Sequence, residues 1–353
     1  MPNHQWNNPS SNSFALSSEE YDLAVPNAAS LMQSLRAFGY DIATAVADLI
    51  DNSITAQANR ISVQFEWNNG NPWISISDNG YGMTEDELFE AMKPGSKNPL
   101  DERSENDLGR FGLGLKTASL SQCKRLTVAS KKDGGRICCR CWDLDVVTQK
   151  NAWLLLKVPT ETAATIIQKH LDKCPSGTIV IWEKIDRIIP GEHVGDEEYQ
   201  RAFLNYAQSV KERISVVFSS YMSGPHKVAF EMNGREISMW DPFMTDNPLT
   251  TRMPTEYLYV NGNEVKIKTF ILPHQKKLSS NEFSLYAGAH GWNAQQGFYI
   301  FRNNRLIVEG SWLLNGFEKA EQYRLARIRI DIGNETDSEW NIDVRKSTAV
   351  PPI

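Results

Sequence analysis

Apolar residues between positions 28 and 58 recur with a helical period. Leu31, Leu35 and Phe38 share one face of this segment. After Gly39 a second apolar stripe begins, and it consists of Ile42, Ala45, Val46, Leu49 and Ile50. Residues spaced in this way lie on one side of an α-helix, so the pattern predicts helix over residues 28–58 with its apolar side against a core.

The pattern then changes to a period of two. Residues 61–65 and 74–76 alternate apolar and polar side chains, which predicts two strands joined by a turn rich in Asn and Gly. A short helix is predicted over residues 85–92, because Thr84 and Glu87 have the spacing of a capping box.

Residues 93–108 show little periodicity and carry many charges, which indicates a long loop. Long loops inside compact domains are usually functional. Residues 112–119 are expected to open a further helix. Four strand-like runs follow, at residues 126–129, 136–142, 153–158 and 178–182. Helices followed by a series of strands predict an α+β fold rather than alternating βαβ units.

The charged stretch 186–198 is the predicted boundary of a second domain, which begins with a long helix over residues 199–219. Within it, the runs 298–301 and 305–308 predict a β-hairpin. We interpret Arg302 and Arg305 as surface charges of this hairpin and assign them no role.

Residues 326–332 alternate strictly along the chain. Ile328, Ile330 and Ile332 fall on one face, and charged residues fall on the other. This pattern predicts a half-exposed strand.

Length and composition agree with two domains. The chain has 353 residues, of which 41% are hydrophobic and 23% charged, and this length exceeds what one ordinary core accommodates. We expect a flexible arm over residues 1–20, a first domain over residues 21–190 and a second over residues 199–353. No apolar run reaches the roughly 20 residues that span a bilayer, and the polar start does not resemble a signal peptide. We therefore expect a cytoplasmic protein.

Charge and cysteine content exclude some functions. The formal net charge of −6 does not indicate a nucleic-acid binder, although a local basic patch is compatible with it. Five cysteines without a signal peptide make a disulfide framework improbable. Cys138, Cys139 and Cys141 lack a second cluster that would complete a zinc site, so we interpret them as reduced residues of a strand.

The first candidate motif lies in the second half of the predicted helix, over residues 48–56. Asp48 and Asn52 are one helical turn apart and point from the same side. The carboxylate could orient or deprotonate a water molecule, and the amide oxygen could ligate Mg²⁺. Taken alone, the same pattern would fit an amphipathic helix with solvated polar residues at its edge.

The second motif, Asp78-Asn79-Gly80-Tyr81-Gly82-Met83, follows a predicted strand. An Asp at a strand end can accept a hydrogen bond from an exocyclic amine such as adenine N6. The glycines at positions 80 and 82 let the backbone bend closely around a ligand. A simple turn between strand and helix is the alternative.

Two glycine-containing segments complete the set. Gly95-Ser96-Lys97 opens the long loop, and residues 109–117 read Gly-Arg-Phe-Gly-Leu-Gly-Leu-Lys-Thr just before a helix. Such segments expose backbone N–H groups, and the helix N-terminus favours phosphate. Lys116 can add a positive charge. The spacing is not that of a Walker A loop.

In order and spacing, the four motifs resemble the signature of the GHKL ATPases, the Bergerat-fold superfamily that includes DNA gyrase, heat-shock ATPase chaperones, MutL and MORC proteins. The resemblance covers roughly residues 40–182. It implies an α/β sandwich, a mixed sheet backed by helices, followed by an α/β transducer-like domain. It also implies ATP and Mg²⁺ as ligands.

Residue roles follow from this resemblance. Asn52 would hold Mg²⁺, Asp78 would bind adenine, and Thr178 would complete the adenine pocket within Ser176-Gly177-Thr178. The other expected nucleotide-binding residues are Gly80, Gly82, Met83, Lys97, Gly109, Arg110, Phe111, Gly112, Leu113, Gly114 and Lys116.

Two residues are expected to act in catalysis. Asp48 stands where hydrolysing relatives usually have Glu, and its carboxylate is one methylene farther from the attacking water, so ATP binding is better supported than turnover. Lys346, in the segment 340–347, resembles the transducer lysine that reaches the γ-phosphate. Arg345 is the alternative for that role, and an exposed basic pair at a strand end is a further reading.

The resemblance implies an ATP-driven switch that dimerises on binding ATP and Mg²⁺, with DNA or an effector protein as partner, in repair, compaction or phage defence. A nucleotide-sensing regulator without appreciable hydrolysis is the main alternative, and a chaperone is another. A histidine kinase fits poorly, because only His4 precedes Asp48. The end at Ile353 suggests either a truncated chain or a protein whose effector is a separate partner.

Overall fold

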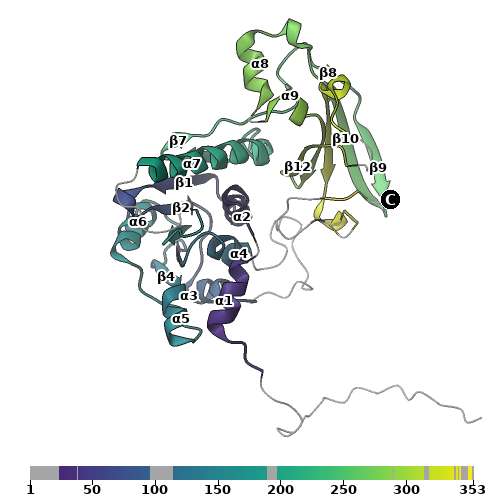
Figure 1. Cartoon of the computed structure of the whole chain (residues 1–353). Coiled ribbons are helices and arrows are strands. Elements are labelled where there is room, and N and C mark those ends of the chain that lie inside the picture. The colour runs from purple at the N-terminus through teal and green to yellow at the C-terminus, as the bar shows by residue number, and fades with distance from the viewer. Residues whose placement is uncertain are drawn as a thin grey trace, which may run out of the picture.

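A computed structural model of the chain describes two β-sheets with their helices (Figure 1). It describes residues 24–37, 39–95, 114–188, 197–288, 290–313, 318–337, 339–340, 342 and 349–351. Among the helices of these residues, none has both the length and the apolar character needed to cross a bilayer.

The first sheet has seven strands in the order β4-β3-β5-β2-β1-β6-β7. Its strands are β1 (Arg60–Glu66), β2 (Trp73–Asp78), β3 (Arg125–Lys131), β4 (Cys138–Asp143), β5 (Gly177–Glu183), β6 (Ala229–Met232) and β7 (Arg235–Glu236). Its helices are α1 (Ala28–Arg36), α2 (Ile42–Thr55), α3 (Glu85–Met92), α4 (Gly114–Leu120), α5 (Leu144–Lys150), α6 (Glu161–Leu171) and α7 (Glu197–Val217). All the pairings are antiparallel except that of β1 with β6.

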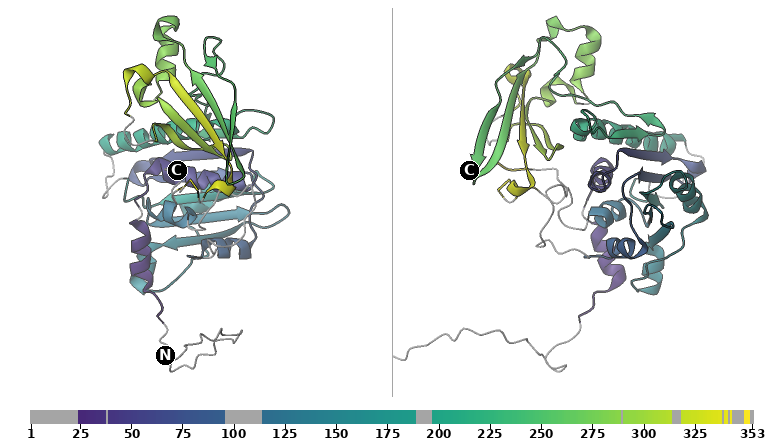
Figure 2. Two further views of the ribbon diagram at one scale, coloured as in Figure 1. Left: turned by 90° about the vertical axis from the view of Figure 1, so that its right-hand side faces the viewer. Right: turned by 180° about the vertical axis from the view of Figure 1, so that it is seen from behind.

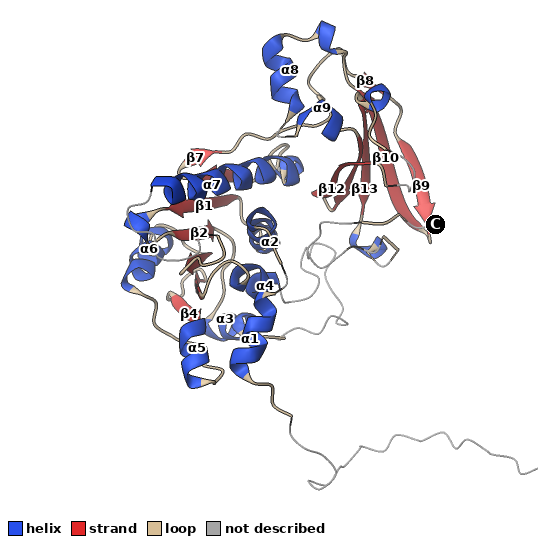
Figure 3. Ribbon diagram, in the orientation of Figure 1, coloured by secondary structure: helices blue, strands red, loops and turns tan. Residues whose placement is uncertain are grey.

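Helices pack on both faces of this sheet (Figure 3). Val180 and Trp182 of β5 face the larger core, to which α1, α2 and α7 contribute, whereas Ile179 and Ile181 face a smaller core closed by α6. The alternation along β5 thus places one apolar set against each layer. A mixed sheet backed by helices confirms the predicted α+β sandwich.

The first sheet continues past the boundary predicted between residues 190 and 199. Helix α7 packs on α2 and β1, and β6 then pairs in parallel with β1. The charged stretch 186–198, of which residues 189–196 lie outside the described part, therefore precedes a helix of the first layer. A run of charged residues indicates exposure to solvent. Connections within a domain are exposed as well as those between domains, so such a run does not by itself mark a boundary.

The second sheet has the order β12-β11-β13-β10-β8, and β9 pairs with β10. Its elements are β8 (Thr251–Arg252), β9 (Glu256–Val260), β10 (Asn263–Ile271), α8 (Ser280–Ala287), α9 (Gly291–Ala294), β11 (Gly297–Arg302), β12 (Arg305–Ser311) and β13 (Ala326–Ile332). Short 3₁₀ helices occur at Asn68–Gly70, Ser219–Tyr221, Gln275–Lys277, Glu321–Tyr323 and Asn334–Thr336. Figure 2 shows α7 between the first sheet and this second unit.

Several local predictions are confirmed. Thr84 and Glu87 form the capping box of α3. The hairpin of β11 and β12 turns at Asn303 and Asn304, whose φ angles of 46° and 66° suit a type I′ turn. One strand prediction is wrong: residues 153–158 form only an isolated bridge between Cys141 and Leu156, and α5 and α6 were not anticipated.

Strand β13 differs from the half-exposed strand that its alternation predicts. Arg327 is 1% exposed, and the guanidinium of Arg329 lies 4.0 Å from the centre of the Phe301 ring. Packing against neighbouring side chains therefore covers much of the polar face as well. The aliphatic and planar parts of Arg can pack in this way, so a two-residue period does not always indicate solvent.

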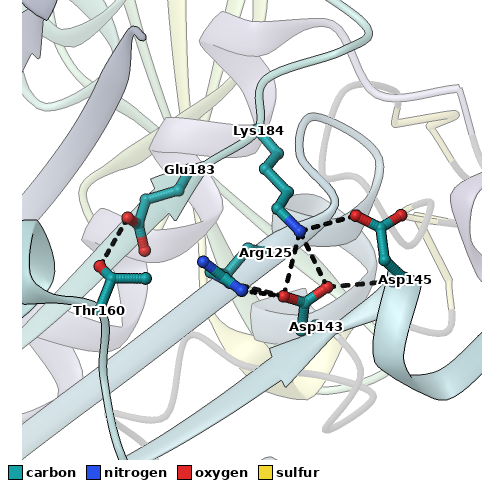
Figure 4. A network of polar contacts seen from close by, with 6 residues as sticks. All are labelled: Arg125, Asp143, Asp145, Thr160, Glu183 and Lys184. Atoms are coloured by element: carbon teal, nitrogen blue, oxygen red, sulfur yellow. Dashed lines mark hydrogen bonds and ion pairs between the residues drawn. The ribbon is translucent and has the colours of Figure 1, made fainter.

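A network of charges lies where β3 begins and where β4 and β5 end (Figure 4). Asp143 ends β4, caps α5 through the backbone N–H of Asp145, and accepts hydrogen bonds from Arg125 and Lys184. Nearby, Thr160 donates to Glu183 at 2.7 Å. Burial alone would raise the pKa of Asp143, but the hydrogen bonds and charges of Lys184 and Arg125 outweigh it and leave the pKa below 3.8.

This network predicts a loss of stability in acid. A carboxyl whose pKa is lower in the folded state stabilises the fold above its unfolded pKa, and that stability is lost as the pH falls through the folded value. Asp143→Asn should therefore lower the melting temperature at pH 7, by an amount equivalent to about 2 kcal/mol. Below about pH 4 the difference from the parent should shrink. Thermal unfolding from pH 7 to pH 3 checks this, and an undiminished difference at pH 3 would contradict it.

Candidate functional site

Helix α2 supplies two of the predicted polar residues. Most of its residues are buried, and Asp48 is 4% exposed, yet Asn52 one turn later is exposed. The hydroxyl of Tyr40 donates a hydrogen bond to Asp48 Oδ2 at 3.0 Å. An exposed amide on an otherwise buried helix is available to a ligand, as the prediction for Asn52 requires.

A residue of the second sheet reaches the same helix. Arg305 of β12 is 1% exposed, and its Nε donates to both carboxylate oxygens of Asp51 at 2.8 Å. Its Nη2 lies 3.5 Å from Asp48 Oδ1. Arg302 is also buried and pairs with Asp337. The interpretation of Arg302 and Arg305 as surface charges is therefore wrong, because both side chains are buried and paired with carboxylates.

Asp78 lies at the end of β2, inside a cradle of donors. Ser53 Oγ donates to Oδ2 at 2.8 Å, and the backbone N–H of Gly80 donates to Oδ1 at 2.9 Å. The N–H of Thr178 also donates to Oδ1, at 3.3 Å. The register of β2 with β5 places Asp78 beside Thr178, as a shared adenine pocket requires, and the contact of both with adenine stays a prediction.

Two effects compete at the Asp78 carboxyl. Burial raises its pKa above 3.8, and the hydrogen bonds from Gly80, Ser53 and Thr178 oppose this. His170 of α6 contacts the backbone of Asp78 rather than its carboxylate. Its Nε2 donates to the carbonyl oxygen of Asp78 at 3.1 Å. The side chain is thus fixed from three elements, so it presents one orientation to a ligand.

The glycines around Asp78 allow close contacts between backbones. A Cβ atom at Gly80 would lie 2.6 Å from Ala56 O, and one at Gly177 would lie 2.2 Å from Asp78 O. Gly82 has φ +66°, and its Cβ would lie 2.0 Å from Lys131 O. The prediction that Gly80 and Gly82 approach a ligand stays a prediction. In the structure, both permit the approach of α2 and β3 to the turn.

Substituting Gly82 should be costly for this reason. We expect Gly82→Ala to lower the free energy of unfolding by about 3 kcal/mol or more, from positive φ and overlap with the β3 backbone together. Gly134 is a matched control, because it has φ +69° and open space around its Cβ position. Gly134→Ala should cost only about 1 kcal/mol. If urea unfolding gave equal losses of unfolding free energy for the two variants, the close contact at Gly82 would contribute nothing to stability.

Ser130 of β3 links the two motifs. Its Oγ accepts a hydrogen bond from Met83 N at 2.8 Å, donates to Gly177 O at 3.0 Å, and lies 2.8 Å from Thr178 Oγ1. Met83 and Thr178, both predicted to line the nucleotide site, are therefore held by one hydroxyl.

The start of α4 faces Asp48. A Cβ built on Gly114 would lie 3.9 Å from Asp48 Oδ2. The Lys116 side chain is buried, and its Nζ donates to the carbonyl oxygens of Ala91 and Lys93 at 2.9 and 2.8 Å. Lys116 therefore joins α4 to the end of α3, and its predicted contact with phosphate stays a prediction.

Part of the predicted site cannot be placed. Lys97, Gly109, Arg110, Phe111, Gly112, Leu113 and Lys346, with the alternative Arg345, lie outside the described residues.

Sequence reasoning missed Tyr40, Asp51, Ser53, Ser130 and Arg305. A usable signal existed for one pair. Asp48 and Asp51 are three residues apart on a helix whose other positions are mostly apolar. Two buried carboxylates on one face require a cation. No comparable signal marks the cation as Arg305, which is 254 positions from Asp51.

The arrangement fits an adenine nucleotide with Mg²⁺. A carboxylate has about four accepting lone pairs, and the three donors to Asp78 leave about one for an exocyclic amine. The exposed amide of Asn52 offers the hard oxygen that Mg²⁺ prefers. Asp48 faces the start of α4, where a phosphate would lie.

Comparisons with known proteins point to the same chemistry. Residues 40–178 match the family model described as "Histidine kinase-, DNA gyrase B-, and HSP90-like ATPase". The chain is similar to the DNA mismatch repair protein MutL of Thermotoga maritima, with 38% identity over 90 residues. It is also similar to ATPase morc-1 of Caenorhabditis elegans, with 30% identity over 91 residues. These matches cover 24% and 26% of the chain.

The chain corresponds to a small part of these relatives. The two matches span 17% and 10% of the relatives' own lengths. A longer match, to MutL of Histophilus somni, has 23% identity and covers 68% of the chain and 42% of that protein. The motifs, the fold and these matches together identify residues 40–178 as an ATPase domain of the GHKL family, with MutL and MORC proteins among its relatives.

Proposed function

We propose that this protein binds ATP with Mg²⁺ and uses binding and slow hydrolysis to switch its conformation. The observation that carries the proposal is the Asp78 cradle, whose three donors leave one accepting position for the adenine amino group. Thr178 and Met83 border the base, Asn52 ligates Mg²⁺, and the start of α4 at Gly114 faces the phosphates. Bound Mg²⁺ supplies charge neutralisation on the phosphate oxygens.

Asp48 is the proposed general base. It accepts a proton from a water molecule whose oxygen bonds to the γ-phosphorus, while the bond from phosphorus to the bridging oxygen breaks and ADP leaves with that electron pair. Tyr40 and Arg305 restrict the carboxylate from either side. The shorter reach of Asp compared with Glu makes this step slow.

The second sheet is the proposed transducer, and the switch is proposed to act through a homodimer. ATP orders the lid that contains Lys97, Lys346 reaches the γ-phosphate, and the arm of residues 1–20 crosses to the second subunit. Two relatives support this proposal, since one is named as a DNA mismatch repair protein and the other as an ATPase. We propose DNA or a DNA-bound effector as partner, in the cytoplasm.

Mass measurement with nucleotide tests the dimer. Light scattering on the chain with Mg²⁺ and a non-hydrolysable ATP analogue should give the mass of two chains, and without nucleotide the mass of one. Asn52→Ala should abolish the change by removing the metal ligand. A single-chain mass with the analogue demonstrably bound would contradict the dimer. The proposed DNA partner is tested in the same samples by fluorescence anisotropy with labelled duplex DNA.

A nucleotide-sensing regulator that does not hydrolyse ATP is the second candidate. The burial of Asp48 and its contacts with Tyr40 and Arg305 favour it, because they restrict the carboxylate's access to water. Steady-state phosphate release separates the two functions. A rate equal to that of Asp48→Ala would support the regulator.

A further inference from the structure

The hairpin of β11 and β12 contacts the first domain at the catalytic face of α2. Arg305 lies at the first position of β12, directly after the turn at Asn303 and Asn304. The hydroxyl of Tyr221, which follows α7, donates to the carbonyl oxygen of Asn303 at 2.5 Å. Arg213 of α7 pairs with Glu309 of β12 at 3.2 Å. The hairpin is therefore fixed at its turn to the 3₁₀ helix Ser219–Tyr221, and along β12 to α7.

Within this interface, Arg305 bridges two carboxylates of α2. Its Nε holds both oxygens of Asp51, and its Nη2 lies 3.5 Å from Asp48 Oδ1. All three side chains are at most 4% exposed. Buried charges in this arrangement are stable only together, because removal of the cation leaves two like charges with little solvent.

The two oxygens of Asp48 therefore have different supports. Oδ2 accepts from Tyr40 within the first domain, whereas Oδ1 faces the guanidinium from the second. A carboxylate held at only one oxygen can rotate about its terminal torsion, which is soft. The orientation of Asp48 toward its water consequently depends on the position of the hairpin.

We propose that Arg305, anchored by Asp51, is the positioning residue through which the second domain sets the orientation of Asp48. The proposal rests on the proposed role of Asp48 as general base. Arg305 does not touch the nucleotide in this account. It links the docking of the hairpin to hydrolysis, so a displaced second domain leaves ATP bound but slowly hydrolysed.

The main test is the double variant Arg305→Met/Asp51→Asn. It removes the bridge but also one carboxylate, so the sum of the buried charges stays as in the parent. We expect the turnover number to fall at least about 10-fold, since a displacement of about 1 Å can cost up to about 100-fold. The dissociation constant of a non-hydrolysable ATP analogue should stay within about 3-fold.

Two further variants complete the design. Arg305→Lys keeps a cation but lacks the planar fork that contacts both carboxylates, so it should fold and still lose turnover. Arg140→Met is the matched control, because it also removes a buried cation from an ion pair, but its partner is Glu85 of α3 rather than a residue of the hairpin or of α2. Its turnover should match the parent. If the double variant does not fold, Arg305→Lys decides the question by the same criterion.

The role of Asp48 must be measured in the same assay. In an Asp48→Ala background, the Arg305 variants should cause no additional loss, because they act through that carboxylate. Parental turnover in Arg305→Lys, an additive loss in the Asp48→Ala background, or an equal loss in Arg140→Met would overturn the proposal. Parental turnover in Asp48→Ala alone would instead overturn the function assigned to Asp48.

Discussion

Asp48→Ala is expected to reduce ATP turnover about 1,000-fold, within the range that general base catalysis contributes. The affinity for a non-hydrolysable analogue should change by less than about 3-fold, because the cradle that holds the base lies at Asp78 on another element. Single-turnover hydrolysis and calorimetry on the same preparation separate the two quantities. A parallel loss of binding and turnover would contradict a role confined to the chemical step.

Asp48→Glu is the companion to this prediction. The longer side chain brings its carboxylate closer to the attacking water, so turnover should rise if reach limits the rate. Crowding is a real cost here, since Tyr40 and Arg305 already contact the carboxylate. Lower turnover with intact binding would show that the surrounding residues fit Asp rather than Glu.

Asp78→Asn should weaken ATP binding about 100-fold, since a hydrogen bond to a charged group contributes about 1.5–3 kcal/mol. The two backbone N–H groups at Oδ1 require the amide oxygen of Asn on that side. The amide NH₂ then points toward Ser53, whose hydroxyl can rotate to accept, and toward the adenine amino group, where donor meets donor. Calorimetric titration with an ATP analogue measures the change.

Ser53→Ala provides the matched control for this position. It removes one donor to Asp78 Oδ2 but leaves the acceptor charge in place. Binding should fall only about 5-fold, as for a typical net hydrogen bond of about 1 kcal/mol. Unchanged affinity in Asp78→Asn, with the melting temperature preserved, would exclude Asp78 as the contact to the base.

Local sequence signals predicted much of the first domain. The capping box of Thr84 and Glu87 could be predicted because it depends on residues that are close in sequence. The motifs at Asp78 and Thr178 could be predicted from a family resemblance. The strand predicted at residues 153–158 was wrong because apolar residues beside a sheet follow the same pattern whether or not they pair. Helix α6 was missed although Thr160 caps it, since its apolar stripe is short.

The charged contacts between the two sheets and their helices could not be predicted in the same way. Arg residues are usually exposed, so Arg305 and Arg327 were read as surface charges of their strands. The burial of Arg305 depends on which face of the second sheet meets α2, whereas Arg327 is buried beside Tyr299 of its own sheet. In both cases packing between parts of the chain that are distant in sequence decides the exposure. The two carboxylates of α2 could have indicated that a cation was needed, but not which one.

The most direct test of the account is the choice between adenine and guanine nucleotides. Adenine carries an amino group where guanine carries a carbonyl oxygen, and the Asp78 carboxylate accepts from the first but repels the second. Calorimetric titration of the unmodified chain with Mg²⁺ should show one bound ATP analogue per chain and at least about 100-fold weaker binding of the GTP analogue. Equal affinity for both, or no detectable binding of either, would contradict the account.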